Sequence, residues 1–191
     1  MGCELTKMIK SEPHDLMNQP PPPSDPRCPL TTKQQYCMLA SWKGIFRQIE
    51  KTGVLLFIKL FEENEDLLHL FEKFQELRTT EDLSQSEELA EHANKVMHTL
   101  DEGIKGLGDI DTFLAYIQHV GATHHQVPGF KAENFWKIEQ PFLQAAKTTL
   151  GERYTANVEN IYKLTIKFIL ENLVKGYEDS AGKEIGNNET T

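Results

Sequence analysis

The sequence contains no long apolar run. Its longest uninterrupted stretch of strongly apolar residues extends only from Val54 to Ile58, whereas a membrane-spanning helix needs about 20 such residues. The N-terminus also lacks the apolar segment of a secretory signal peptide. These two absences argue against an integral membrane protein and against secretion by the usual route.

Basic residues are in the minority, with 20 lysines and arginines against 29 aspartates and glutamates and a net charge of −9. A protein that binds a phosphate backbone needs a basic face, so this charge argues against nucleic acid as a partner. It also argues against simple electrostatic adhesion of the chain to anionic lipid. With 191 residues, 39% of them hydrophobic, the chain is long enough for one domain with a proper core.

Cysteine is scarce, and its three copies, Cys3, Cys28 and Cys37, all lie near the N-terminus. An odd number of clustered cysteines does not form the framework of a secreted, disulfide-rich protein, and it favours a reducing compartment. The spacing of Cys28 and Cys37 permits a bridge, although only their proximity in the sequence supports one.

Residues 1–29 form an N-terminal extension that begins Met-Gly-Cys-Glu-Leu-Thr. Gly2, with Thr6 at the favoured hydroxyl position, fits the N-myristoylation pattern, and Cys3 beside it is a natural site for a palmitoyl chain. One acyl chain holds a protein to a bilayer only marginally, and two hold it stably. Seven of the nine prolines lie between residues 11 and 29, which predicts an extended spacer or, alternatively, a ligand for SH3 or WW domains.

Residues 30–177 show no strand alternation, and their apolar pattern is helical throughout. We therefore expect an all-α fold of seven to eight helices, packed as an irregular globule and followed by a disordered polar tail at residues 178–191. The pattern places helix starts at Thr31 or Thr32, after Thr52-Gly53, at Ser84 with Glu87, and at Asp109 or Asp111. It also predicts a loop over residues 75–85, a kink or break at Pro141, and a last helix that ends before Gly176.

Two of the expected helices carry an apolar stripe that contains a histidine. The first stripe consists of Leu89, His92, Val96 and Leu100, and the second of Phe113, Ile117, Val120 and His124. Within each helix the spacing places the four side chains on one face. Two histidines that point into an apolar interior from different helices suggest a group that needs nitrogen ligands.

The surrounding motifs exclude most metal and catalytic sites. Zinc needs four ligands, and neither a Cys-x-x-Cys nor a His-Glu-x-x-His motif is present. A di-iron site needs Glu-x-x-His motifs on paired helices, and only His92 has glutamates near it. The Cys-x-x-Cys-His motif of covalent haem attachment and a nucleophile elbow are also absent. Non-covalent haem b fits best, because its iron takes one or two axial imidazoles within a flat apolar slot.

Several residues carry a resemblance to the globin family over residues 30–177. Trp42 matches the tryptophan of the first globin helix, and Phe71, followed by Phe74, matches the phenylalanine of the corner before the distal helix. His92, 21 residues after Phe71, matches the distal histidine, and Val96 the valine one turn further. His124 in Val-Gly-Ala-Thr-His matches the proximal histidine.

The resemblance is greatest to hexacoordinate globins. The 32 residues from His92 to His124, together with Phe57 and Lys95, resemble neuroglobin and cytoglobin more than myoglobin. The Met-Gly-Cys start and both extensions resemble globin X, the membrane-anchored branch. The sequence departs from the family in having Glu65 where globins often carry proline, and in Pro141 within the seventh helix.

The resemblance implies a globin fold around a haem pocket, with His124 as the proximal ligand and His92 as the distal, sixth ligand. The implied pocket residues are Phe57, Phe71, Lys95, Val96 and Phe135. His119 lies about 140° around the helix from His124, and His125 about 100° further. Helical phase therefore selects His124 from this cluster.

The expected function is a hexacoordinate haem protein that binds O2, CO or NO reversibly. Its predicted role is in redox, electron-transfer or nitrite and nitric oxide chemistry, with an unidentified electron donor or reductase, at the cytoplasmic face of a membrane. Two alternatives remain at this stage, an oxygen store or carrier and a haem-free helical adaptor that binds partners through its proline segment.

Overall fold

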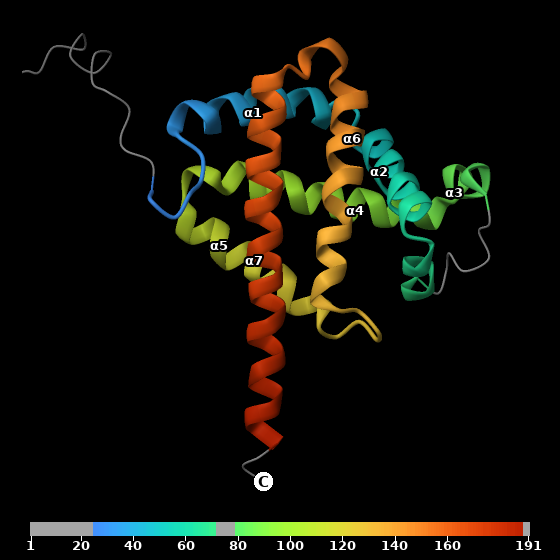
Figure 1. Ribbon diagram of the computed structural model, residues 1–191, viewed down its shortest axis with the longest axis vertical. Coiled ribbons are helices and arrows are strands. Elements are labelled where there is room, and N and C mark those ends of the chain that lie inside the picture. Colours follow the sequence, from blue (N-terminus) through green and yellow to red (C-terminus); the bar gives the residue numbers. More distant parts are fainter. Residues whose placement is uncertain (1–24, 72–78, 189–191) are drawn as a thin grey trace, which may run out of the picture.

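The computed structural model describes residues 25–71 and 79–188, and these residues form an all-α fold without strands (Figure 1). The α-helices are α1 (Thr32–Phe46), α2 (Ile49–Glu63), α3 (Thr80–Gln85), α4 (Glu87–Lys105), α5 (Ile110–His124), α6 (Glu139–Leu150) and α7 (Ala156–Asn188). Short 3-10 helices occur at η2 (Glu65–Leu70), η4 (Gly106–Gly108), η5 (Ala132–Ile138) and η6 (Gly151–Arg153). The predicted all-α class is confirmed.

Side-chain caps set several helix starts. Thr31 and Gln34 form a capping box at the start of α1, and Asp109 accepts a hydrogen bond from the backbone N–H of Thr112 at the start of α5. Both starts agree with the sequence. The cap of α4 is Ser86 rather than the predicted Ser84, because Ser84 lies inside α3. The predicted loop at residues 75–85 is therefore helical from Thr80, and residues 72–78 lie outside the described part.

Gly53 lies within α2, although the sequence predicted a break there. The helix begins at Ile49, which the sequence had assigned to the preceding helix. A Cβ atom on Gly53 would lie 2.8 Å from Cγ of Met97 and 3.1 Å from the carbonyl oxygen of Ala93. The glycine thus allows α2 to approach α4 closely, and this tertiary contact outweighs its low helix propensity.

The chain between residues 131 and 150 divides into η5 and α6, as Pro141 led us to expect. The division falls at residues 138 and 139, which places Pro141 in the first turn of α6. A proline is tolerated there, because the N–H groups of the first turn have no partner within the helix.

The last helix, α7, is longer than predicted and continues through Gly176 to Asn188. Residues 178–188, expected to be a disordered tail, are therefore helical. Residues 178–188 carry no apolar stripe, so apolar periodicity did not reveal this part of the helix. No helix in the described part of the chain has the length and apolarity needed to cross a membrane.

A buried polar contact joins the first helix to α4. The indole Nε1–H of Trp42 donates a hydrogen bond to Oδ1 of Asp101 at 2.8 Å, and Nζ of Lys105 lies 2.6 Å from Oδ2. Asp101 is 2% exposed, so these two partners offset the cost of burying its charge.

The closest crossing in the fold is between α5 and α7, which run past one another in Figure 1. A Cβ atom on Gly121 would overlap the carbonyl oxygen of Leu173, and one on Gly176 would overlap that of Gln118. The two backbones are therefore in direct contact. Stacking of Phe113 on Phe168, with ring centroids 4.9 Å apart, extends the crossing.

We expect Gly121→Ala and Gly176→Ala each to lower the free energy of unfolding by about 3 kcal/mol or more, because the added methyl group meets backbone that cannot turn aside. Urea unfolding followed by circular dichroism measures the change. Gly182→Ala in α7, the helix that contains Gly176, is the control, because a Cβ atom added at Gly182 meets nothing within 4 Å. It should raise stability by up to about 1 kcal/mol. Equal effects of the three substitutions would contradict the close crossing.

Candidate functional site

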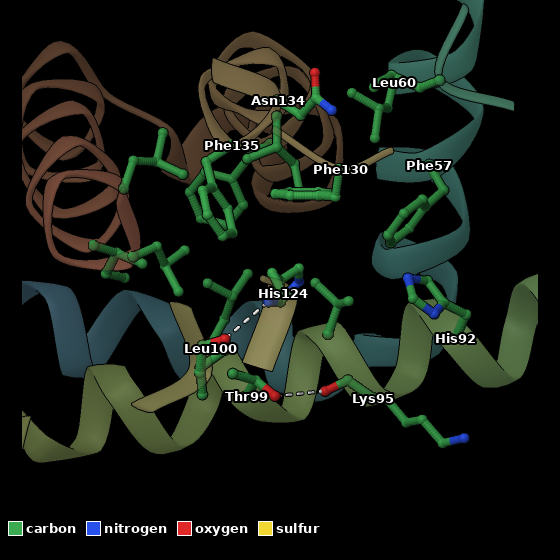
Figure 2. A pocket seen from close by; sticks show the side chains of 18 of the residues that line it. Phe57, Leu60, His92, Lys95, Thr99, Leu100, His124, Phe130, Asn134 and Phe135 are labelled. Atoms are coloured by element: carbon green, nitrogen blue, oxygen red, sulfur yellow. Dashed lines mark hydrogen bonds between the residues drawn. The ribbon is translucent and has the colours of Figure 1, made fainter. Parts of the chain in front are cut away.

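A cavity of about 260 Å³ lies between α2, α4, α5, α7 and the η5 segment (Figure 2). Its lining is Phe57, Leu60, Leu67, Leu70, Phe71, His92, Lys95, Val96, Thr99, Leu100, Ile117, Val120, His124, Phe130, Asn134, Phe135, Ile138, Phe142, Ile166, Ile169, Leu170 and Leu173. Both histidine stripes contribute to this wall. Apart from two imidazoles, one lysine, one threonine and one asparagine, the lining is apolar.

His92 reaches the cavity from α4, near Phe57 (Figure 2). Its ring packs edge-to-face against Phe57 and Phe71, with centroid distances of 5.1 Å to each. Burial lowers the pKa of His92 below 6.5, and the charges of His124 and Lys95 add to the effect. The ring is therefore neutral near pH 7, the form in which an imidazole nitrogen can bind a metal.

His124 is the last residue of α5, and its ring nitrogen Nδ1 lies 2.8 Å from the carbonyl oxygen of Val120. A carbonyl can only accept, so Nδ1 carries a proton, and in the neutral ring Nε2 has the lone pair that can bind a metal. Phe130 and Phe135 contact the same ring, at centroid distances of 5.1 and 4.9 Å. A donated hydrogen bond from the second nitrogen is the usual way in which proteins orient a metal-binding histidine.

The other described histidines lie outside the cavity. His119 is exposed, and the ring of His125 packs against Tyr177 at 5.2 Å. His69 and His98 are also exposed. The structure therefore places His124, and neither of its two histidine neighbours, in the wall of the cavity.

The five predicted pocket residues all line this cavity: Phe57, Phe71, Lys95, Val96 and Phe135. Lys95 lies at the rim, where its Nζ is 2.7 Å from Oε1 of Glu91 and its side chain is 71% exposed. Trp42 lies outside the cavity but touches its wall, with its ring 6.4 Å from that of Phe142. Phe74, Gly2 and Cys3 lie outside the described residues. Cys28 and Cys37 are free thiols.

Sequence reasoning missed part of the wall. Phe130 and Asn134 come from the segment around η5, whose irregular backbone has no periodic pattern to read. Ile166 and Leu170 come from α7, where the apolar stripe pointed to a buried face but not to what that face covers. These contributions depend on how α7 and η5 pack against α4 and α5.

The donor set of the cavity fits haem. Among the described residues, no group of three or more histidine, cysteine, aspartate or glutamate side chains is placed to hold a metal ion. Two imidazoles alone cannot complete the coordination of iron, and a porphyrin supplies the four equatorial nitrogens that they lack. The aromatic and aliphatic walls suit the apolar faces of such a ring.

Comparisons with known proteins identify the family of the chain. Residues 54–173 match the Globin family. The chain is 29% identical over 156 residues to a neuroglobin of Tetraodon nigroviridis and 28% identical to one of Dissostichus mawsoni, covering 80% of this chain and 98% of each relative. A solved hexacoordinated heme protein from an anhydrobiotic tardigrade superposes with a TM-score of 0.78 and 34% identity, over 81% of this chain and 99% of that one.

The cofactor of these proteins is haem b, held without a covalent bond. The family match spans more than half of the chain and includes both cavity histidines. The chain therefore belongs to the globin family.

Proposed function

We propose that this globin is bis-histidyl and hexacoordinate, with His124 as the fixed proximal ligand and His92 as the displaceable sixth ligand. The observation that carries the proposal is that two imidazoles face one apolar cavity from separate helices. The likeness to neuroglobins and to the tardigrade hexacoordinated heme protein supports it.

The contacts of His124 hold its imidazole in one orientation. Its Nδ1–H donates to the carbonyl of Val120 in its own helix, and two phenylalanine rings hold the imidazole laterally. Its helix, α5, is in backbone contact with α7 through Gly121. The orientation of Nε2 therefore depends on the most tightly packed part of the fold.

His92 is suited to leave the sixth position. It lies on α4 beside the rim, one turn from the exposed Lys95, and two aromatic edges contact its ring. Each such ring contact contributes about 0.5–1.5 kcal/mol beyond area burial, and a displacing ligand would have to offset these contacts as well as the bond from His92 to the iron.

When bound, haem supplies an iron that takes up gaseous ligands and changes its oxidation state by one electron. The chain's role would be to present one imidazole on each side of the haem. The ligands around the iron would then be the same in its ferric and ferrous states. We propose reversible binding of O2, CO or NO together with redox, electron-transfer or nitrite and nitric oxide chemistry. Oxygen storage is the weaker candidate, because a competing side chain lowers ligand affinity about a hundredfold when 1% of the protein is open.

We further propose that the protein works at the cytoplasmic face of a membrane, anchored through myristoyl Gly2 and palmitoyl Cys3. This part rests on the N-terminal motif alone. Two acyl chains would give stable attachment where one gives a marginal one.

The substitution His92→Leu should leave ferrous iron five-coordinate and raise the rate of CO binding about a hundredfold if 1% of the wild type is open. Leucine fills the space without offering a lone pair. Absorption spectra of the ferric, ferrous and CO forms, with flash photolysis, measure both effects. A wild-type ferrous spectrum of the five-coordinate kind would contradict the assignment of His92.

Replacing His124 with alanine should lower haem affinity by more than the 10–100-fold typical of losing an outer-shell partner, since the fixed ligand itself is removed. Haem transfer to a high-affinity acceptor measures the loss. His119→Ala removes an exposed histidine from the same helix and should leave haem retention unchanged. Similar loss in the two variants would show that the proximal assignment is wrong.

In eukaryotic cells, Gly2→Ala should move the protein from the membrane fraction to the supernatant, because it removes the acceptor for myristate. Cys3→Ala should weaken attachment less, since one acyl chain remains. Cys37→Ala is the matched cysteine control and should stay membrane-bound. Mass spectrometry of the N-terminal peptide identifies the acyl groups, and an unmodified peptide would rule out the anchor.

A further inference from the structure

A second hollow, of about 580 Å³, lies on the outer surface between α1 and the C-terminal end of α4. Besides Leu39, Ala40 and the acidic Asp101, its lining combines aromatic and basic side chains, namely Tyr36, Trp42, Lys43, Phe46, Arg47 and Lys105. We refer to these six residues as the α1 face. Trp42 also contacts Phe142 of the haem cavity wall, with ring centroids 6.4 Å apart.

The charge of the α1 face is opposite to that of the chain. Residues 30–49 contain three of the 20 basic residues and none of the 29 acidic ones. Lys43 and Arg47 form no ion pair among the residues that the structure describes. Beyond a Debye length of about 10 Å at 0.1 M salt, the acidic remainder of the protein is largely screened. Lys105 is paired with Asp101 and Glu102, so the positive charge that a partner meets at this face is mainly that of Lys43 and Arg47.

The α1 face also exposes aromatic rings. Tyr36 is 74% and Phe46 45% exposed, and they are two of the four large hydrophobic residues exposed in the described part. Nζ of Lys105 lies 5.5 Å from the ring centre of Phe46. Exposed aromatic rings interleaved with lysine and arginine are typical of surfaces that lie at the level of lipid headgroups.

The α1 face lies on the side from which the N-terminal segment enters the fold. Arg27 forms an ion pair at 2.8 Å with Asp111 in the first turn of α5, six residues after Lys105. In Figure 1 the described chain enters beside the start of α1 and the adjoining ends of α4 and α5. The 24 residues that precede Asp25, including Gly2 and Cys3, therefore connect to the fold near this face.

We propose that the α1 face is the surface with which the protein lies against an anionic lipid bilayer. The inference rests on the membrane attachment proposed above and deepens it, because it predicts which side faces the membrane. A basic patch next to an acylated segment is the second signal that stabilises a marginal lipid anchor. Each lysine or arginine close to an anionic surface strengthens binding about fivefold.

The test is lysine footprinting on the full, haem-loaded chain, tethered by an N-terminal histidine tag to nickel-chelating lipid. This tether makes the result independent of whether Gly2 is acylated, which the mass of the N-terminal peptide decides separately. Vesicles are phosphatidylcholine alone or with about one-third phosphatidylserine, at about 0.1 M salt. Acetylation of Lys43 and Lys105 by a water-soluble reagent, followed by mass spectrometry, should slow about fivefold on the anionic vesicles.

Lys167 and Lys175, exposed on α7, are the internal controls and should react at the same rate on both vesicles. The pair Lys43→Glu with Arg47→Glu should abolish the protection of Lys105, whereas Lys167→Glu with Lys175→Glu, an equal change of charge, should preserve it. Unchanged rates at Lys43 and Lys105, as expected if this face binds an acidic protein instead, would overturn the proposal. Equal slowing of the α7 lysines would overturn it as well.

Discussion

The backbone contact between α5 and α7 is the constraint on which the rest of this structure depends. Gly121 and Gly176 let the two helices meet without intervening side chains, and this crossing fixes α5 against α7 three residues before α5 ends. His124 is the last residue of that helix, so its position follows from the crossing. The same approach places Ile169 and Leu173 of α7 in the cavity wall beside it.

Different physical features prepare the two histidines to bind a metal. His92 has its pKa lowered mainly because burial penalises the charged ring. In His124 the hydrogen bond to Val120 selects the tautomer that leaves Nε2 able to bind a metal. An apolar cavity with one rigid and one displaceable imidazole suits haem, and the difference between their settings underlies the proposed ligand exchange at His92.

The α1 face differs in charge from the rest of the protein. Net acidity masks a local basic and aromatic face on α1, and Trp42 joins this face to the interior through Phe142 on one side and Asp101 on the other. Helix α4 therefore contributes residues both to the haem cavity and to the hollow at the proposed membrane-facing surface. If the α1 face lies on a bilayer, the haem is held at a defined distance and angle from the lipid.

The sequence by itself determined the helical class, the globin resemblance and the choice of His124 over His119, because each depends on local chemistry or on helical phase. It also narrowed two helix caps to Thr31 or Thr32 and to Asp109 or Asp111. Tertiary structure decided the rest. Gly53 and Gly176 continue helices that local propensity would have ended, since close contact with a neighbouring helix at Gly53 and Gly176 outweighs that propensity. Likewise, Phe130 and Asn134 become cavity residues only when η5 packs beside α5 and α7, a placement that no local pattern encodes.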